Sequence, residues 1–229
     1  VANGTYTNAL SPASNGVVCI GNLVSPASVV VPLIGLRNNG FVGGVRVTSS
    51  ITFLREGSRI RLRQVVTTGG VDWVDAKDCR ADTISTSGAV VLAASSGYLA
   101  LRDTIIGLTI TTSTNNGWAF RTGLASQTPS SRGRMLWGVF KNVTINSTVT
   151  ASEGWSAVKL FQATSSLFYN WQVNHTQGAT SDNSGNYGRR AFIIRDSSGW
   201  NTFRRVNIRV TMASASAIFR NVWTTSATA

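Results

Sequence analysis

A six-residue pattern of apolar positions recurs along the chain. Apolar residues occupy its first, fourth and sixth positions, as in Phe140-Lys-Asn-Val143-Thr-Ile145. Further copies begin at Ile105, Phe168 and Phe203, and residues 42–47 are an earlier candidate. Because each copy is short and has one apolar side, we expect these positions to be buried by stacking copies on one another. The residues expected to be buried and stacked in register are Ile105, Leu108, Phe140, Val143, Phe168, Trp171, Phe203 and Val206.

A second element precedes most copies and consists of an alanine, apolar residues and usually an arginine. Successive alanines of this element lie 19, 38, 34 and 26 residues apart, with loop-like sequence at 126–134, 150–154 and 178–188. The alanines are Ala100, Ala119, Ala157, Ala191 and Ala217. Each unit therefore predicts a strand, a tight turn, a second strand and a variable loop. Irregular spacing fits stacked β units, whose loops can vary in length without disturbing the stack.

The sequence before residue 98 also predicts strands. Residues 41–53 and 59–66 alternate with period two, and residues 88–94 are an apolar strand candidate. Residues 71–81 predict a helical turn or two. In the segment 59–66, the expected inner residues are Ile60, Leu62 and Gln64, and the outer ones are Arg59, Arg61 and Arg63.

The repeated segments resemble the right-handed parallel β-helix, or pectin-lyase-like, proteins of the phage tailspike and virion surface type. Residues 140–145 carry the resemblance, with looser copies at Phe168 and Phe219, and it spans about residues 98–223. It implies an all-β solenoid that assembles as a homo-oligomer, a trimer. A β-sandwich or jelly roll is the alternative fold. Polysaccharide lyases and hydrolases share the β-helix architecture, so the fold alone does not decide the function.

The distribution of charged residues divides the chain into three parts. Residues 1–36 contain no charged side chain and are expected to form an arm or cap that packs on its own domain or on a neighbouring chain. Residues 37–97 are a β-rich part that includes the first repeats as a candidate, and residues 98–229 hold the solenoid repeats. Neither a transmembrane segment nor a secretory signal is expected, because no long apolar run is present.

The composition predicts a basic protein with an acidic partner. Lys and Arg number 21 against 9 Asp and Glu, which gives a net charge of +12 over 229 residues. Nucleic acid, an acidic glycan or the acidic face of a protein shell would suit such a surface. Seven arginines lie between residues 189 and 220, against Asp196 alone. The expected binding residues are Arg189, Arg190, Arg204, Arg205, Arg209, Arg220 and Trp200.

Candidate catalytic groups are few. Asp103 and Asp196 each follow an arginine and would form a carboxylate row or, as we expect, act as turn residues. Four aspartates within residues 72–82 match no calcium loop and are expected to pair with Lys77 and Arg80. His175 is expected to be exposed or at a loop edge. No catalytic residue, metal or cofactor is predicted.

Two cysteines, Cys19 and Cys79, are too few for a disulfide scaffold or a zinc site. We expect two unpaired, mostly buried thiols, with a disulfide between them as the alternative.

These observations together predict a non-enzymatic structural protein of a virion surface or tail, in contact with other virion proteins. One alternative is a glycan-binding or glycan-cleaving adhesin with the same architecture. A nucleic-acid-binding protein is the second alternative, and charge alone favours it.

Overall fold

The computed structural model describes residues 2–8, 15–31, 34–36, 38–53, 59–73, 76–92, 99–113, 118–122, 134–149, 156–178, 190–195, 198–214 and 221–226. Within these ranges the chain is all-β, apart from one short 3-10 turn, η1 (Pro26–Ser28). The all-β prediction is therefore confirmed. No helix in these ranges is long and apolar enough to cross a membrane.

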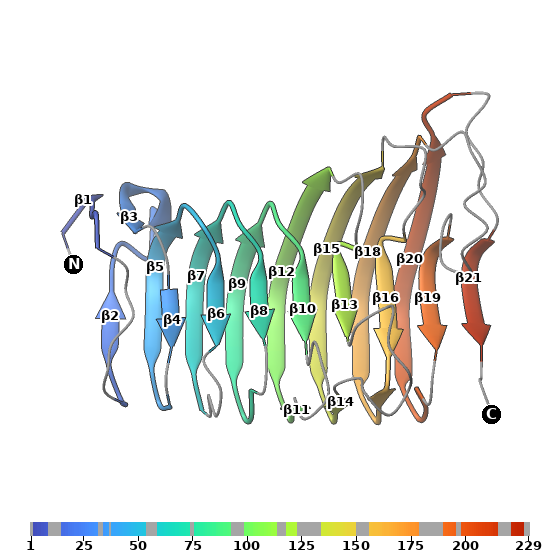
Figure 1. The fold of residues 1–229 in the computed structure, drawn as a ribbon, viewed down its shortest axis with the longest axis horizontal. Helices are drawn as coiled ribbons and strands as arrows, with labels where there is room; N and C mark the ends of the chain where they lie inside the picture. Colours follow the sequence, from blue (N-terminus) through green and yellow to red (C-terminus); the bar gives the residue numbers. More distant parts are fainter. Residues whose placement is uncertain are drawn as a thin grey trace.

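The strands form three sheets (Figure 1). The ten-stranded sheet contains β1 (Gly4–Thr5), β2 (Val18–Ile20), β3 (Val29–Val31), β5 (Phe41–Val47), β7 (Arg61–Thr67), β9 (Arg80–Thr86), β12 (Thr104–Ser113), β15 (Val139–Val149), β18 (Leu167–Gln177) and β20 (Thr202–Met212). The eight-stranded sheet contains β4 (Ile34–Leu36), β6 (Ile51–Phe53), β8 (Val71–Trp73), β10 (Val90–Leu92), β13 (Phe120–Thr122), β16 (Val158–Phe161), β19 (Arg190–Arg195) and β21 (Asn221–Ser226). The three-stranded sheet contains β11 (Leu99–Leu101), β14 (Arg134–Leu136) and β17 (Ala163–Thr164).

The chain visits the sheets in turn. From β5 onward, each strand of the ten-stranded sheet is followed by one strand of the eight-stranded sheet, and between β10 and β18 a strand of the three-stranded sheet comes next. Strands of the two large sheets run in opposite directions and stack along the long axis of the molecule (Figure 1). Neighbours within every sheet are parallel. The sandwich and jelly-roll alternatives require antiparallel neighbours, so these pairings do not support them.

The predicted register of the repeated segments is confirmed. Ile105, Phe140, Phe168 and Phe203 pair in one column of the ten-stranded sheet. A second column contains Leu108, Val143, Trp171 and Val206. The first three members of each column are buried, as expected, whereas Phe203 and Val206 are only half-buried. Both of the latter lie on β20, the last strand of the sheet, which has one neighbour among the described strands.

The same columns continue through the strands before residue 98. Val42, Leu62 and Ala81 pair in the column of Ile105, which confirms residues 42–47 as an earlier copy. The helical turns expected over residues 71–81 are wrong, because β8 and β9 are strands. In β8 the buried residues Val71 and Trp73 are two positions apart, which is the period of a strand.

One left-handed residue per strand explains why the first two apolar positions of the pattern are three residues apart. Such a residue takes up the extra position, as in a β-bulge, so that both apolar neighbours still face inward. These residues precede the second column in register and have φ values of 51° to 74°: Gly44, Gln64, Thr83, Gly107, Asn142, Asn170 and Arg205. Gln64 is therefore not an inner residue of β7, as the alternation predicted, and Val65 is buried instead.

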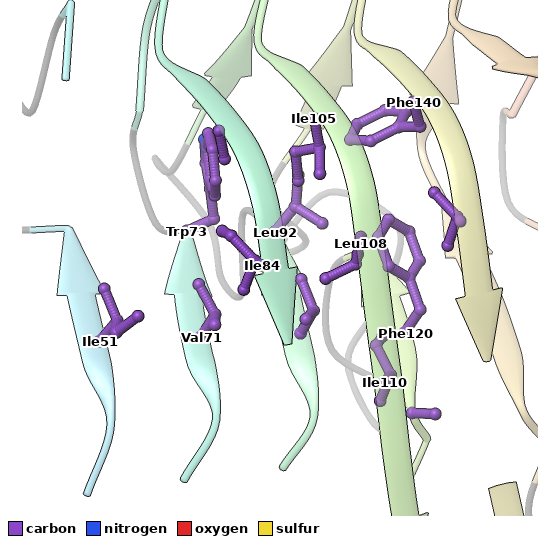
Figure 2. Close-up of a cluster of buried hydrophobic side chains, with 14 of the residues drawn as sticks. Ile51, Val71, Trp73, Ile84, Leu92, Ile105, Leu108, Ile110, Phe120 and Phe140 are labelled. Carbon is purple, nitrogen blue, oxygen red and sulfur yellow. The ribbon is translucent and has the colours of Figure 1, made fainter. Parts of the chain in front are cut away.

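The core lies between the two large sheets. Figure 2 shows Trp73, Leu92 and Phe120 from the eight-stranded sheet meeting Ile84 and Leu108 from the ten-stranded sheet. Further along the stack the core becomes aromatic. The ring of Phe168 stacks on Phe140 at 5.4 Å and on Phe203 at 4.8 Å, between ring centroids. Phe120 and Trp171 meet edge to face at 5.2 Å.

In the uncharged N-terminal segment, β1, β2 and β3 extend the ten-stranded sheet, whereas β4 joins the eight-stranded sheet. β2 and β3 both pair with β5, and residues 21–28 run between them. A Cβ on Gly44 would lie 2.5 Å from the carbonyl carbon of Asn22, so this close approach requires glycine. The packing of this segment on a neighbouring chain, and the division into three parts, stay predictions.

Candidate functional site

Three of the predicted binding arginines lie together on β20. The side chains of Arg204, Arg205 and Arg209 are exposed on the outer face of the ten-stranded sheet. Phe203, Val206, Ile208 and Val210 are half-buried and point the other way. The guanidinium of Arg205 lies 5.5 Å from the ring centroid of Tyr169.

The other predicted binding residues lie elsewhere. Arg190 belongs to β19 of the eight-stranded sheet, so it does not join the three arginines on β20. Arg189 and Arg220 lie outside the described residues. Trp200 precedes β20 at a corner of the molecule, and 88% of its surface is exposed.

Parallel stacking of the strands brings further basic residues, distant in the sequence, to the same surface as the arginines of β20. The outer face of every long strand in the ten-stranded sheet turns toward the same side as Arg204, and we call this surface the basic face. Its described cations are Arg46, Arg61, Arg63, Arg80, Lys141, Arg204, Arg205 and Arg209. The alternation of Arg61 and Arg63 in the sequence was a signal for this face. Nothing in the sequence indicated that these arginines share a face with those of β20, which lie more than 120 residues later.

The basic face has an excess of positive charge that its own carboxylates do not balance. Among its described residues, Asp82 supplies the only carboxylate and pairs with Arg80 at 2.9 Å between Nε and Oδ2. Arg61 lies in register beside Arg80, one strand spacing of about 4.8 Å away. Like charges directly opposite each other destabilise a sheet, so an anion bound here would relieve a local repulsion.

The aspartate side chains of residues 72–82 do not meet at one site. Asp82 pairs with Arg80 as expected, whereas Asp78 pairs with Arg102 of the next unit at 2.8 Å. Asp72 lies on the eight-stranded sheet, where burial raises the pKa of its carboxyl and nearby Arg121 partly opposes that rise. Asp75 lies outside the described residues. No group of three or more His, Cys, Asp or Glu in the described ranges is placed to hold a metal ion.

Asp103 has a structural partner. Its side chain is buried, and its Oδ1 accepts a 2.8 Å hydrogen bond from the backbone N–H of Cys79, one unit back. Burial raises the pKa of this carboxyl well above its usual value. This bond joins two units rather than closing a turn within one, so the expected turn role of Asp103 stays a prediction. Asp196 lies outside the described residues, so the carboxylate row stays a hypothesis.

The expectation for His175 is wrong, because the residue is buried in β18 rather than exposed. Its Nδ1 lies 3.0 Å from the hydroxyl of Ser147, and its Nε2 lies 2.9 Å from Oε1 of Gln177. An amide oxygen only accepts, so Nε2 carries the proton and Nδ1 accepts from the serine. Burial lowers the pKa of this histidine. β18 continues past the six-residue pattern, and this continuation turns His175 inward.

Both cysteines are free, as expected. Cys79 is buried and Cys19 is half-buried, and the disulfide alternative is wrong. Burial and the nearby Asp103 carboxylate raise the pKa of the Cys79 thiol to about 12. A thiol of that pKa is inert at neutral pH, which fits a packing role.

Comparison of the chain with protein-family models, with curated proteins and with solved structures finds no match.

Proposed function

We propose that the repeated units form a right-handed parallel β-helix. Parallel pairing, the in-register apolar columns and the return of the chain to the same sheet in each unit support this proposal. Connections between parallel strands of one sheet are right-handed in nearly all proteins. The stack creates flat outer faces on which equivalent positions repeat along the molecular axis.

We propose that this β-helix is a non-enzymatic structural protein that docks on an acidic protein partner through its basic face. The observation that carries the proposal is the set of arginines on that face, opposed by Asp82 alone in the described residues. The resemblance to tailspike and virion-surface β-helices supports placing the assembly in a virion, with other virion proteins as partners.

Charge reversal on the basic face tests the docking. The double variant Arg204→Glu, Arg209→Glu is expected to weaken binding to poly-glutamate at least about tenfold, because two attractive charges become repulsive. Binding by the unmodified protein should fall as salt rises, since these side chains are exposed. Titration of a labelled probe, followed by fluorescence anisotropy, measures both effects.

The matched control is Arg59→Glu, Lys77→Glu, which makes the same change in net charge away from the basic face. It should lower the affinity much less. Equal losses in the two double variants would mean that only net charge matters and would contradict a defined docking face. Tighter binding to duplex DNA than to poly-glutamate would favour nucleic acid as the partner instead.

We further propose a homo-oligomer, a trimer. The half-buried apolar residues of β20, such as Phe203 and Ile208, lie at the last strand of the sheet and gain burial if another chain covers them. Sedimentation of native protein is expected to give a mass three times that of the 24.4 kDa chain. A monomer at micromolar concentration and physiological salt would contradict this proposal.

A further inference from the structure

A second column of left-handed residues lines one corner of the molecule. Each member lies two positions before a strand of the ten-stranded sheet, and those strands are in register. The column contains Asn39, Arg59, Asp78, Arg102, Trp137, Ser165 and Trp200, with φ values between 52° and 56°. Trp137 and Trp200 are 63 residues apart in the sequence but only two units apart along this corner.

Tryptophan is an unfavourable residue at these two positions. Left-handed backbone suits glycine and asparagine, whereas a bulky residue is strained there. Neither indole belongs to the buried core, because 55% of Trp137 and 88% of Trp200 is exposed. Strained backbone and exposed aromatic surface together are typical of binding sites, where they are retained for contact with a ligand.

A hollow of about 350 Å³ lies beside this corner. The residues that line it are Arg134 and Leu136 of β14, Thr164 of β17 and Gln162, which directly precedes β17. Leu136 and Thr164 directly precede Trp137 and Ser165 in the chain, so the hollow adjoins the tryptophan row. In the next unit Gly199 pairs with Thr164, and a Cβ there would meet no atom within 4 Å. Space beside Gly199, the residue before Trp200, is therefore open as well.

The spacing of the indoles defines the shape of a ligand. Two strand spacings separate them by about 9.6 Å, and the small side chain of Ser165 lies between them. A ligand along this corner would place two flat, apolar ring faces on the indoles and a polar middle over Ser165. Arg134 adds a guanidinium, which forms forked hydrogen bonds with carboxylate or sulfate.

We propose that this corner binds an acidic oligosaccharide, with sugar rings stacked on Trp137 and Trp200 and an acidic substituent on Arg134. Pyranose rings combine an apolar face with hydroxyl groups at the edge, and the lining of the hollow combines apolar Leu136 with polar Gln162 and Thr164. The spacing of the indoles is comparable with the length of a disaccharide. This site lies off the basic face and does not depend on the docking proposed for that face.

The test uses asparagine, because asparagine tolerates left-handed backbone. Trp137→Asn and Trp200→Asn are each expected to weaken binding at least tenfold, while the thermal unfolding temperature stays equal or rises. If either tryptophan had a purely structural role, its replacement would lower the thermal unfolding temperature of the protein. The probes are hexasaccharides of alginate, hyaluronan, oligogalacturonate and heparin, measured by calorimetry on the intact chain. Arg134→Gln should weaken binding of the preferred acidic hexasaccharide about tenfold.

Three controls separate the outcomes. The basic-face variant Arg204→Glu, Arg209→Glu should keep the oligosaccharide affinity at physiological salt, so failure of the docking proposal would not affect this one. Equal affinity for neutral cellohexaose would overturn the acidic assignment, and tighter binding of oligo-dT would assign the corner to single-stranded nucleic acid instead. Absence of binding to every acidic probe, or unchanged binding by both asparagine variants, would overturn the proposal.

Discussion

Replacement of Phe168 by alanine is expected to lower the free energy of unfolding by about 3–5 kcal/mol. Phe168 is fully buried in the middle of the aromatic stack. Its ring contacts Phe140 and Phe203 face to face and Trp171 edge to face at 5.3 Å. Truncation removes these contacts and leaves a cavity that neighbouring strands, hydrogen-bonded on both sides of β18, are unable to close. Chemical denaturation followed by tryptophan fluorescence measures the change.

Phe203→Ala is the matched control, because Phe203 occupies the same column on the edge strand β20. It is only half-buried, so its loss should cost about 1–2 kcal/mol. The denaturant dependence should stay the same in both variants, which would show that the surface exposed on unfolding has not changed. Equal losses at the two positions would mean that Phe168 is not at the centre of the core.

Gly69→Ala is expected to lower the free energy of unfolding by about 3 kcal/mol. Gly69 lies in the turn between β7 and β8, and a Cβ there would overlap the backbone carbonyl of Ser49 in the preceding unit. That carbonyl already accepts a 2.7 Å hydrogen bond from the Thr67 hydroxyl, and the Gly69 carbonyl accepts one of 2.6 Å from Thr86. Because these bonds hold the turns together, the backbone is unable to move aside without losing them.

Gly199→Ala serves as the control for the glycine substitution. A Cβ at Gly199 meets no atom within 4 Å, so this variant should unfold at the same denaturant concentration as the parent or slightly higher. Thermal and chemical unfolding of the two variants, measured side by side, test the tight stacking of the turns. If Gly69→Ala left the free energy of unfolding as little changed as Gly199→Ala, the turns of successive units would not be in close contact.

Part of this arrangement was readable from local sequence, because it depends on side-chain alternation. The spacing of Phe140, Val143 and Ile145 predicted inward-facing residues and, by repetition, a shared register. The copy that begins at Phe203 likewise predicted that Phe203 and Val206 face inward. Such patterns are local, since consecutive residues of a strand point to opposite faces wherever the strand lies.

Other features depended on which residues the stack brings into register. The sequence did not show which of the two residues between apolar positions is left-handed, so the side of Gln64 was misassigned. It also did not show that β18 runs on to bury His175, because the strand extends beyond the repeated pattern. In both cases the neighbouring strands decide the conformation by hydrogen bonding and packing.

The sequence by itself determined the strands of the repeated pattern, their apolar side and the basic character of the chain. Only the tertiary structure decided that Arg61 and Arg204 share one face and that Trp137 and Trp200 share one corner. The physical reason is the variable length of the loops between units, which removes any fixed sequence interval between residues that stack. Hydrogen bonding between parallel strands nevertheless places equivalent residues of successive units one strand spacing apart in space.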